Sequence, residues 1–316
     1  MLTRRALLKA AAGLGLTSFG FTGYALGVEP WAHHITRYRP RLSGWPQDLH
    51  LRIALVADVH ACEPWMDLER VERIVVDTNA LSPDLILLLG DYMAHHRFVR
   101  RTIPASEWAR AFAGFRAPLG VHAILGNHDW WDDPNVQKRR ADWWDAVEAV
   151  RRRHGPVRAR RALEAAGIPV YENDAKRLAK GGRAFWLAGL GDQLAFRRLA
   201  RSRARAATGV DDLPGTMAKI SDNAPVLLMA HEPDIFPKVS RRVAVTFSGH
   251  THGGQVALAG FAPIVPSRYG RRFAYGHIVE EGRHLIVSGG LGCSGMPLRF
   301  GVPPEIVLVE LGGRDA

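Results

Sequence analysis

Seven side chains that can bind metal ions stand at the ends of apolar runs of the sequence. They are Asp58, His60, Asp91, Asn127, His231, His250 and His252. The carboxyl ends of strands in an open α/β sheet converge on one crevice, so side chains that are distant in sequence can meet there. Oxygen and nitrogen donors without thiolate suit Mn, Fe or Zn better than Ca or Mg. Seven donors are too many for one tetrahedral ion but fit two divalent ions that share a carboxylate.

The local sequence indicates how these side chains are presented. Gly90 allows the backbone to turn sharply before Asp91, which makes Asp91 the natural bridging carboxylate. One residue separates Asp58 from His60, and one separates His250 from His252. Because side chains two positions apart point the same way in an extended chain, we expect extended backbone at both pairs.

Apolar runs predict the strands that must position these residues. They are Leu51–Ala57, Leu85–Leu89, Val121–Leu125, Phe185–Leu190, Val226–Ala230, Val243–Phe247, Leu285–Ser288 and Ile306–Leu311. Apolar residues recur at helical spacing between Leu68 and Thr78, so the first two runs and this helix form a unit that builds parallel sheet. From Val243 onward, glycines, prolines and short apolar runs predict mainly β structure.

Five ordered motifs resemble those of the calcineurin-like metallophosphoesterase superfamily. They are Asp58-Val59-His60, Gly90-Asp91, Gly126-Asn127-His128-Asp129, the isolated His231, and Gly249-His250-Thr251-His252. The resemblance covers roughly Leu49 to Leu311. It implies an α/β fold, a four-layer α/β/β/α sandwich of two mixed sheets with a dinuclear metal site at the C-terminal ends of the strands. Gly253-Gly254-Gln255, the region of Pro297-Leu298-Arg299 and the N-terminus further resemble the bacterial YkuE-like and YaeI-like phosphoesterases.

The same resemblance implies a role for each site residue. One ion would be held by Asp58, His60, Asp91 and His252, and the other by Asp91, Asn127, His231 and His250. Two such ions activate water for in-line attack on phosphorus. His128 would stabilise the transition state or protonate the leaving oxygen, and Asp129 would serve catalysis by orienting neighbouring groups.

Two further residues are candidates for contact with substrate. His95 follows Asp91 on a loop expected over the site, as does His96, with surface or packing roles as the alternative. Arg299 can hold a phosphate with two hydrogen bonds, although an arginine on a loop can equally be a solvated charge.

Composition limits the class of protein. A chain of 316 residues that is 47% apolar can bury a full core, and two cysteines cannot form a disulfide framework. The formal net charge of +11 favours an anionic partner such as a phosphate ester, a nucleic acid or an anionic membrane. We divide the chain into a leader (1–27), a linker (28–48) and a metallophosphoesterase domain (49–316) with a helical insertion at about 132–165.

The leader resembles a twin-arginine export signal. Arg4, Arg5 and Lys9 precede an uncharged, apolar stretch from Ala10 to Val28. This implies the twin-arginine translocase as a partner, and a periplasmic location or a tether on the outer side of the cytoplasmic membrane. An uncleaved stretch of 19 residues is just long enough to cross a bilayer core of about 30 Å.

Three functions remain open on this evidence. The first is a phosphoesterase with two divalent ions, Mn or else Fe or Zn, that hydrolyses phosphodiester or pyrophosphate bonds, with lipid-linked envelope substrates such as UDP-2,3-diacylglucosamine as examples. The second is a nuclease, but the arginines cluster in one insertion rather than along a groove, which argues against nucleic acid. The third is a non-catalytic scaffold, against which the complete ligand set argues.

The tryptophans and arginines between Trp130 and Arg161 allow two interpretations. Core packing is one, and a cap that binds a membrane-presented anion is the other.

Overall fold

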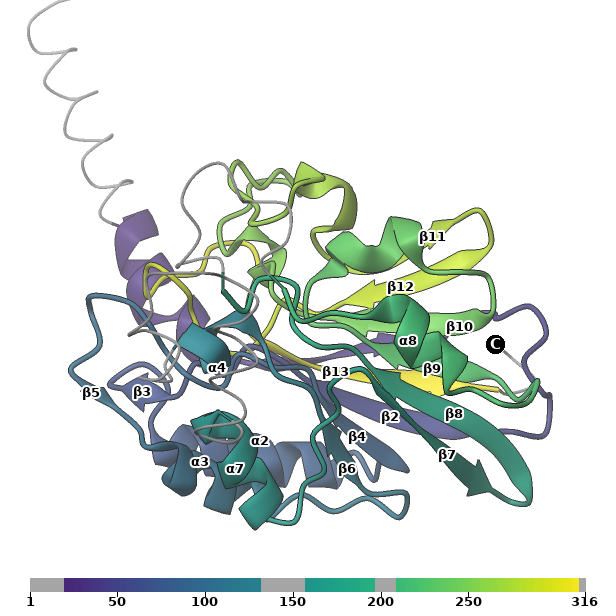
Figure 1. The fold of residues 1–316 in the computed structure, drawn as a ribbon. Helices are drawn as coiled ribbons and strands as arrows, with labels where there is room; N and C mark the ends of the chain where they lie inside the picture. The colour runs from purple at the N-terminus through teal and green to yellow at the C-terminus, as the bar shows by residue number, and fades with distance from the viewer. Residues whose placement is uncertain (1–19, 132–156, 197–208, 313–316) are drawn as a thin grey trace, which may run out of the picture.

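The computed structural model describes residues 20–131, 157–196 and 209–312, and two large mixed sheets form its centre (Figure 1). The first sheet has the order β1-β13-β2-β4-β6 and the second has the order β11-β12-β10-β9-β8-β7. A small third sheet pairs β3 (Cys62–Glu63) with β5 (Arg101–Thr102).

In the first sheet β2, β4 and β6 run in one direction, and β1 and β13 run in the opposite direction. Its strands are β1 (His34–Tyr38), β2 (Leu51–Val56), β4 (Leu85–Leu88), β6 (Val121–Ala123) and β13 (Glu305–Leu311). β13 runs antiparallel to β2 and parallel to β1. The predicted strand, helix and strand at the start of the domain are β2, α2 (Leu68–Ala80) and β4, and the two strands are parallel as expected.

The second sheet has four parallel central strands and two antiparallel edges. The central strands are β8 (Arg183–Gly189), β9 (Val226–Met229), β10 (Val243–Ser248) and β12 (Arg283–Val287). The edges are β7 (Asp174–Lys180) and β11 (Gly276–Glu280). Each predicted apolar run therefore lies in one of the two large sheets.

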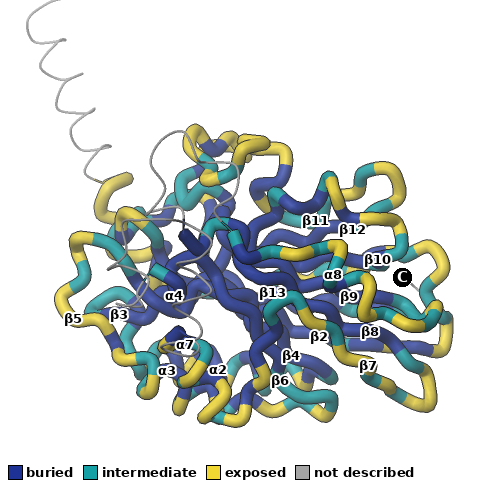
Figure 2. The backbone as a smooth tube through the Cα atoms, viewed as in Figure 1, coloured by how far each residue is buried: buried dark blue, intermediate teal, exposed yellow. Residues whose placement is uncertain are grey.

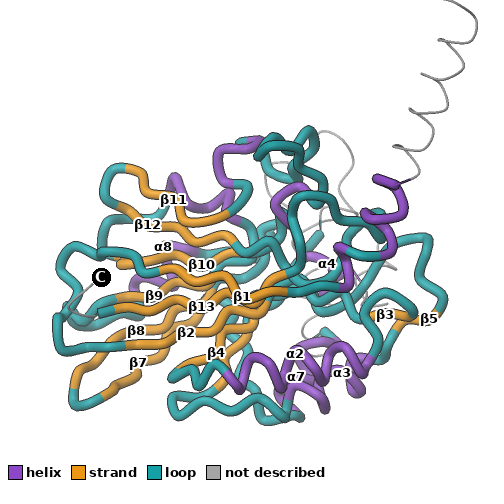
Figure 3. Tube along the Cα trace, turned by 180° about the vertical axis from the view of Figure 1, so that it is seen from behind, coloured by secondary structure: helices purple, strands orange, loops and turns teal. Residues whose placement is uncertain are grey.

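Helices cover the outer faces of both sheets. On the outer side of the first sheet lie α2, α3 (Ala105–Phe112) and α7 (Arg158–Ala165), which Figure 3 shows grouped together. On the second sheet α8 (Leu213–Ala218) contacts β7 and β8, and the 3-10 helix η2 (Pro233–Lys238) contacts β10 and β12. The other short helices are α4 (Asn127–Trp131), η1 (Glu29–Trp31), η3 (His252–Gly254) and η4 (Gly270–Phe273).

Alternation of side chains along the strands builds the layers. In β2, Ile53 and Leu55 enter the core between the two sheets, where they meet Leu187 and Phe247 of the second sheet. Their neighbours along the strand point the other way, into the core beneath the helices. The helix α2 buries Val71, Ile74, Val75 and Thr78, which recur at helical spacing. The strands are the most deeply buried part of the molecule (Figure 2), and the predicted four-layer α/β/β/α sandwich is confirmed.

The segment 28–48 is more than the linker that we expected. It contributes η1 and the edge strand β1, and the side chains of Glu29 and Pro30 are buried. The Glu29 carboxylate accepts hydrogen bonds from the amides of Gly301 and Val302, at 3.0 and 2.8 Å. The strand β1 also pairs with β13, so both sets of hydrogen bonds attach the segment to the first sheet. The domain therefore begins before residue 49.

Two other expectations about the chain fall mainly outside the described residues. Of the insertion at 132–165, the described part is 157–165, which contains α7. Of the leader, the described part is 20–27, which is helical. Among the residues that the structure describes, no helix combines the length and the apolar character needed to span a membrane.

Candidate metal centre

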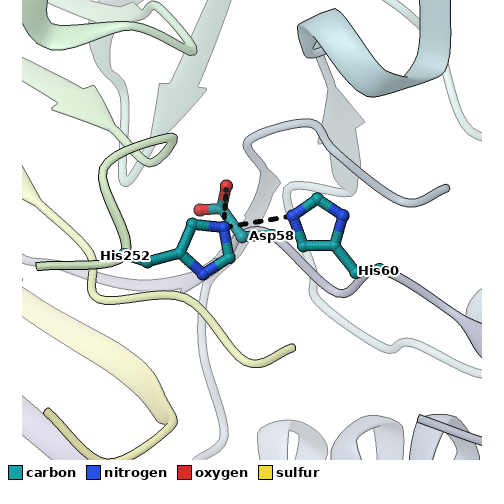
Figure 4. A group of neighbouring side chains, drawn as sticks. All are labelled: Asp58, His60 and His252. Carbon is teal, nitrogen blue, oxygen red and sulfur yellow. Dashed lines mark hydrogen bonds and ion pairs between the residues drawn. The ribbon is translucent and has the colours of Figure 1, made fainter. Parts of the chain in front are cut away.

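The structure gathers the candidate ligands at the carboxyl ends of β2, β4, β9 and β10. One buried group joins Asp58, His60 and His252 (Figure 4), and in it one ligand atom of each residue lies within 4.8 Å of the others. A second group with the same spacing joins Asp91, His231 and His250. Six of the seven predicted ligands are therefore in two adjacent clusters. Asn127, at the start of α4, lines a cavity together with Asp91, His250 and His252.

The ligand atoms of the first cluster face one another. His60 Nε2 lies 3.1 Å from His252 Nε2, and His252 Nε2 lies 3.5 Å from Asp58 Oδ1. The other ring nitrogen of His60, Nδ1, donates to the Met93 carbonyl at 2.9 Å. A neutral imidazole carries one proton, so this bond leaves His60 Nε2 unprotonated and free to bind a cation.

The second cluster has the same chemistry with a different nitrogen in one histidine. His231 Nδ1 donates to the Leu89 carbonyl at 2.7 Å, and its Nε2 lies 3.2 Å from Asp91 Oδ2. His250 uses Nε2 to donate to the Pro266 carbonyl at 2.9 Å, which leaves Nδ1 as the ligand atom. Asp91 Oδ2 is also 3.8 Å from His60 Nε2, so the Asp91 carboxylate faces both clusters.

Unpaired buried atoms test whether metal ions fit this arrangement. Asn127 Oδ1 and His250 Nδ1 are buried without a hydrogen-bond partner, and the buried His231 Nε2 lies 3.2 Å from the Asp91 carboxylate without a hydrogen bond of good geometry. Buried polar atoms are normally paired, since an unpaired one costs about 1–3 kcal/mol. All three atoms belong to the predicted ligand set, and divalent cations would satisfy them together. The residues therefore fit a pair of divalent metal ions.

Two glycines keep the backbone close to these carboxylates. A Cβ at Gly126 would lie 2.3 Å from Asp91 Oδ1, and a Cβ at Gly249 would lie 2.4 Å from Asp58 Oδ2. Real side chains do not tolerate such distances, so any other residue would displace the ligands. This close approach explains the glycine at the start of the third and fifth motifs.

Burial and neighbouring charges shift the pKa of several ligands. Burial alone would raise the pKa of Asp91, but the imidazoles of His231 and His128 outweigh it and hold that pKa well below its usual range. Burial would lower the pKa of His231, yet the Asp91 carboxylate raises it well above its usual range. Without a metal, this pair is therefore a carboxylate with an imidazolium, and a cation would replace the proton.

In the first cluster, the pKa shifts keep the two histidines neutral and able to bind a cation. Burial lowers the pKa of His60 to about 4 and holds the pKa of His252 well below its usual range, so both rings are neutral near pH 7. Burial, with the charge of Asp91 as a smaller cause, raises the pKa of Asp58 to about 7. A bound cation would favour the ionised form of Asp58.

The prediction of extended backbone at the paired ligands is wrong. Asp58, His60, His250 and His252 have φ of 53°, 48°, 68° and 51°, which is the left-handed region that residues other than glycine rarely adopt. In an extended chain His250 and His252 would point the same way. Here they enter different clusters, which the left-handed turns allow. Such conformations collect at functional sites, where the surrounding structure compensates their cost.

His128 faces the space beside the ligands. Its backbone amide donates to Asp91 Oδ1 at 2.8 Å, its Nδ1 lies 3.3 Å from His95 Nδ1, and its Nε2 lies 3.4 Å from Ser294 Oγ. Burial lowers the pKa of His128 well below its usual range, so the ring is neutral in the absence of metal and can donate one hydrogen bond. It also lies within 4.8 Å of His60 and Asp91 in a third possible ligand group.

A cavity of about 530 Å³ opens beside these residues. Metal-centre residues form one wall, and apolar side chains form much of the rest. The apolar lining includes Trp131, Leu194, Val256, Ile264, Met296 and Leu298. A cavity of this size accommodates a ligand that joins a phosphate group to an apolar moiety.

Asp129 lies outside the cavity lining and binds the backbone around Asp91, so its expected part in catalysis would be to orient neighbouring groups. Its side chain is buried, and one carboxylate oxygen accepts from the amides of Asp91 and Gly126, both at 2.9 Å. The other oxygen accepts from the amides of Tyr92 and Met93, at 2.9 and 3.2 Å. With both oxygens committed to backbone, Asp129 fixes the loop that carries Asp91.

Replacing Asp129 by Asn tests this positioning role. An amide has only one acceptor oxygen, so two of the four buried backbone donors lose their partner, and we expect the free energy of unfolding to fall by about 2–6 kcal/mol. Metal affinity should fall about 10- to 100-fold, as for other residues that orient ligands. Chemical denaturation and metal titration measure the two effects. Asp174→Asn, at an exposed ion pair with Lys219, is the matched control, and equal stability of both variants would contradict the role.

Arg299 is not available to substrate, which corrects both interpretations of this residue. Its exposed fraction is 0%, so it is neither a phosphate clamp nor a solvated charge. The guanidinium donates to the carbonyls of Gly289, Gly292 and Val302, and Nη2 lies 3.1 Å from His252 Nδ1. Arg299 therefore holds the loop behind the first cluster and contacts one of its ligands.

His95 lies beside His128, near the site as predicted. Its ring contacts that of His128, with centroids 5.2 Å apart. His96 is instead next to the thiol of Cys62, at 4.0 Å. Cys62 and Cys293 are both free and buried, and burial raises the pKa of each thiol, so they fill space in the structure.

Sequence reasoning missed Asp192 and Glu232, which form a further buried group with His231. Asp192 Oδ2 and Glu232 Oε1 have no hydrogen-bond partner of ordinary type. Burial and then the charge of Glu232 raise the pKa of Asp192 well above its usual range. The signal was present, because Gly191-Asp192 follows β8 as Gly90-Asp91 follows β4.

The proposed cap falls mostly outside the described residues. Trp143, Trp144 and the arginines at 139–140 and 151–153 lie there. Within the described part, Trp130 is buried against Phe196, with ring centroids 5.5 Å apart, and Trp131 lines the cavity. Trp130 therefore belongs to the core.

Comparison with known proteins agrees with the geometry. The sequence model described as calcineurin-like phosphoesterase matches residues 51–254. The chain is 29% identical to the uncharacterized metallophosphoesterase YkuE of Bacillus subtilis, over 98% of each chain. It is 29% identical to the phosphodiesterase YaeI of Escherichia coli, over 98% of this chain and 100% of that one. It is 26% identical to the UDP-2,3-diacylglucosamine pyrophosphatase LpxG of Chlamydia trachomatis, over 91% and 92%.

Proposed function

The chain belongs to the calcineurin-like phosphoesterase family and is a metal-dependent phosphoric ester hydrolase, and from this premise we propose that it cleaves phosphodiester or pyrophosphate bonds of lipid-linked envelope substrates. The observation that carries the proposal is the pair of buried ligand clusters that share Asp91 and leave Asn127 Oδ1 and His250 Nδ1 without a partner. A scaffold without chemistry has no use for such atoms, because each of them costs stability.

Each residue has a place in this reaction. Asp58, His60, Asp91 and His252 would hold one divalent ion, and Asp91, Asn127, His231 and His250 the other. Bound divalent ions polarise the phosphoryl oxygens and lower the pKa of water. His128 stands at the cavity wall, where it can donate a proton to the leaving oxygen or a hydrogen bond to the phosphoryl group. Asp129 and Arg299 hold the loops that carry the ligands.

The apolar cavity supports a lipid-linked substrate. Side chains such as Leu194, Ile264 and Met296 can pack against acyl chains, whereas a nucleotide or a small sugar phosphate would leave them in contact with water. The relative LpxG is named as a pyrophosphatase of UDP-2,3-diacylglucosamine, which joins a phosphate bond to acyl chains. We propose a substrate of this chemical class.

The choice of metal follows from the donor set. Four imidazoles with two carboxylates and one amide oxygen suit Mn, Fe or Zn, and we propose Mn as the working pair. We also propose that the twin-arginine translocase exports the protein, which then acts in the periplasm or as a tethered enzyme on the outer side of the cytoplasmic membrane. Arg4 and Arg5 before an uncharged stretch support this location.

A substrate screen with metal analysis tests the proposal. The full chain is loaded with Mn and assayed on bis-p-nitrophenyl phosphate, a phosphomonoester, UDP-2,3-diacylglucosamine and single-stranded DNA. We expect two bound ions per chain by elemental analysis, turnover of the model diester, and a higher kcat/KM for the diacylated substrate. Preference for DNA would favour a nuclease instead. Full metal content without turnover of any ester would contradict the proposed activity.

A further inference from the structure

Exposed apolar side chains gather on one surface of the enzyme. Leu258, Phe261 and Ile264, which lie between η3 and η4, are 68%, 52% and 77% exposed. Phe21 and Tyr24, from the helical residues 20–27, are also exposed. We call these five residues the apolar face. Figure 1 shows residues 20–27 (purple) and the segment between β10 and β11 (light green) at the upper end of the molecule, and Figure 2 shows exposed stretches there.

Phe300 connects the two parts of this apolar face. The rings of Phe21 and Tyr24 pack on it, with centroids 5.1 and 6.1 Å away. Its carbonyl accepts from the amide of Ala257 at 2.7 Å, directly before Leu258. Leu258 and Phe261 then close a tight turn, with backbone hydrogen bonds of 3.0 and 2.9 Å. The exposed apolar side chains therefore sit on hydrogen-bonded backbone that holds them in place.

The apolar face continues into the cavity beside the metal centre. Ile264 belongs to both, since it is the most exposed member of the face and also lines the cavity. Met296 is likewise exposed and lines the cavity. An apolar surface in contact with this face would therefore lie at the mouth of the cavity.

An arginine borders the apolar face. Arg271 lies over the ring of Phe261, with Cζ 4.3 Å from the ring centroid. Arg268 and Arg272 are paired with Asp234 and Glu280, but within the part of the chain that the structure describes Arg271 has no carboxylate partner. Apolar side chains beside an arginine that lacks a carboxylate partner can contact acyl chains and anionic headgroups of a lipid surface together.

The sequence before residue 20 favours the same partner. Residues 10–19 carry no charged side chain, and Arg4, Arg5 and Lys9 precede them. This segment joins the described chain at Gly20, on the helix that carries Phe21 and Tyr24. An apolar and basic segment thus enters the molecule at the apolar face.

We propose that the apolar face docks on an anionic lipid bilayer, with Leu258, Phe261 and Ile264 at the level of the headgroups and the cavity mouth beside them. Docking in this orientation would let a lipid-linked phosphate reach the metal centre from the bilayer. The inference goes beyond the proposed chemistry, because it concerns which surface meets the membrane and holds for any ester that the enzyme cleaves.

Site-specific fluorescence in the full chain tests the orientation. Phe261→Cys is labelled with a nitrobenzoxadiazole fluorophore, and Val76→Cys is the matched control, since Val76 is 63% exposed on α2. The native thiols of Cys62 and Cys293 are buried, and labelling of the parent chain checks that they do not react. The labelled proteins are mixed with phosphatidylcholine vesicles that contain or lack phosphatidylglycerol.

We expect a blue shift and a rise in emission at position 261 with phosphatidylglycerol vesicles, a smaller response to phosphatidylcholine alone, and none at position 76. A label at 261 that stays in water while the protein is vesicle-bound would overturn the proposal, as would equal responses at both positions. A blue shift that depends on protein concentration without vesicles would indicate self-association and would overturn it too.

Hydrolysis of bis-p-nitrophenyl phosphate separates this proposal from the proposed function. Position 261 lies outside the cavity lining, so both labelled proteins should keep the parent's rate on this soluble diester. A lost response to vesicles with full hydrolysis would remove the docking surface and leave the activity intact. A lipid response without hydrolysis by the parent or by either labelled protein would contradict the proposed activity and leave the docking surface intact.

Discussion

Replacing Asp91 by Asn removes both metal ions and lowers kcat/KM on bis-p-nitrophenyl phosphate by at least about 10⁴-fold, since each ion supplies several kcal/mol of transition-state stabilisation. Asp91 Oδ2 lies 3.2 Å from His231 Nε2 and 3.8 Å from His60 Nε2, so one side chain serves both clusters. An amide cannot bridge two cations, because it offers a single neutral oxygen. Elemental analysis and steady-state kinetics measure the two losses.

The Asn variant keeps the shape of the side chain and can still accept from the amide of His128, so folding is preserved. Circular dichroism checks this. Asp48→Asn is the control, because Asp48 is exposed and forms a surface ion pair with Arg183 that contributes little. An Asp91→Asn protein that retains two ions and the parent rate would contradict the bridging role and with it the dinuclear centre.

Replacing His128 by Gln lowers kcat by about 10²- to 10⁴-fold, the range expected for loss of a proton donor, while metal content stays at the parent level. His128 faces the cavity, and its Nδ1 and Nε2 have only distant partners, at 3.3 and 3.4 Å. A proton donor matters less when the leaving group is acidic. We therefore expect a smaller loss on p-nitrophenyl esters than on alkyl esters, and rate measurements on both series decide the role.

Three outcomes separate the possible roles of His128. An equal loss on both ester series would indicate a hydrogen bond to the phosphoryl group instead of proton donation. Loss of metal would instead make His128 a ligand in the group that it forms with His60 and Asp91. His50→Gln, at an exposed histidine, is the control and should leave both metal content and rate unchanged.

Much of the fold could be predicted because buried strands and helices have recognisable apolar patterns in the sequence. Strands buried on both faces need continuous apolar runs, and a helix on a sheet needs an apolar stripe, as in α2. The edge strand β1 was missed for the opposite reason. Its residues are half-buried or exposed, so no apolar run distinguishes His34–Tyr38 from a linker. Its place in the sheet depends on pairing with β13, at the other end of the chain.

Arg299 and Asp129 show what a motif leaves open about an individual residue. Both are charged residues in or near the motifs, and charged side chains are seldom buried without partners. Their partners here are backbone groups, the carbonyls around Arg299 and the amides around Asp129. Backbone groups have no signature in the sequence, so the hydrogen-bond partners of neither residue could be predicted before the loops were folded.

The sequence by itself determined the set of metal-binding side chains and their places at strand ends, because ligand chemistry depends on residue type and strand burial depends on apolar runs. Only the tertiary structure decided which ring nitrogen of His60, His231 and His250 faces the site, how the backbone turns at the paired ligands, and where the exposed apolar side chains meet. These depend on left-handed turns at His250 and His252 and on contacts between distant segments, such as Phe21 with Phe300. Such contacts arise when the chain folds, since they join residues that no local pattern connects.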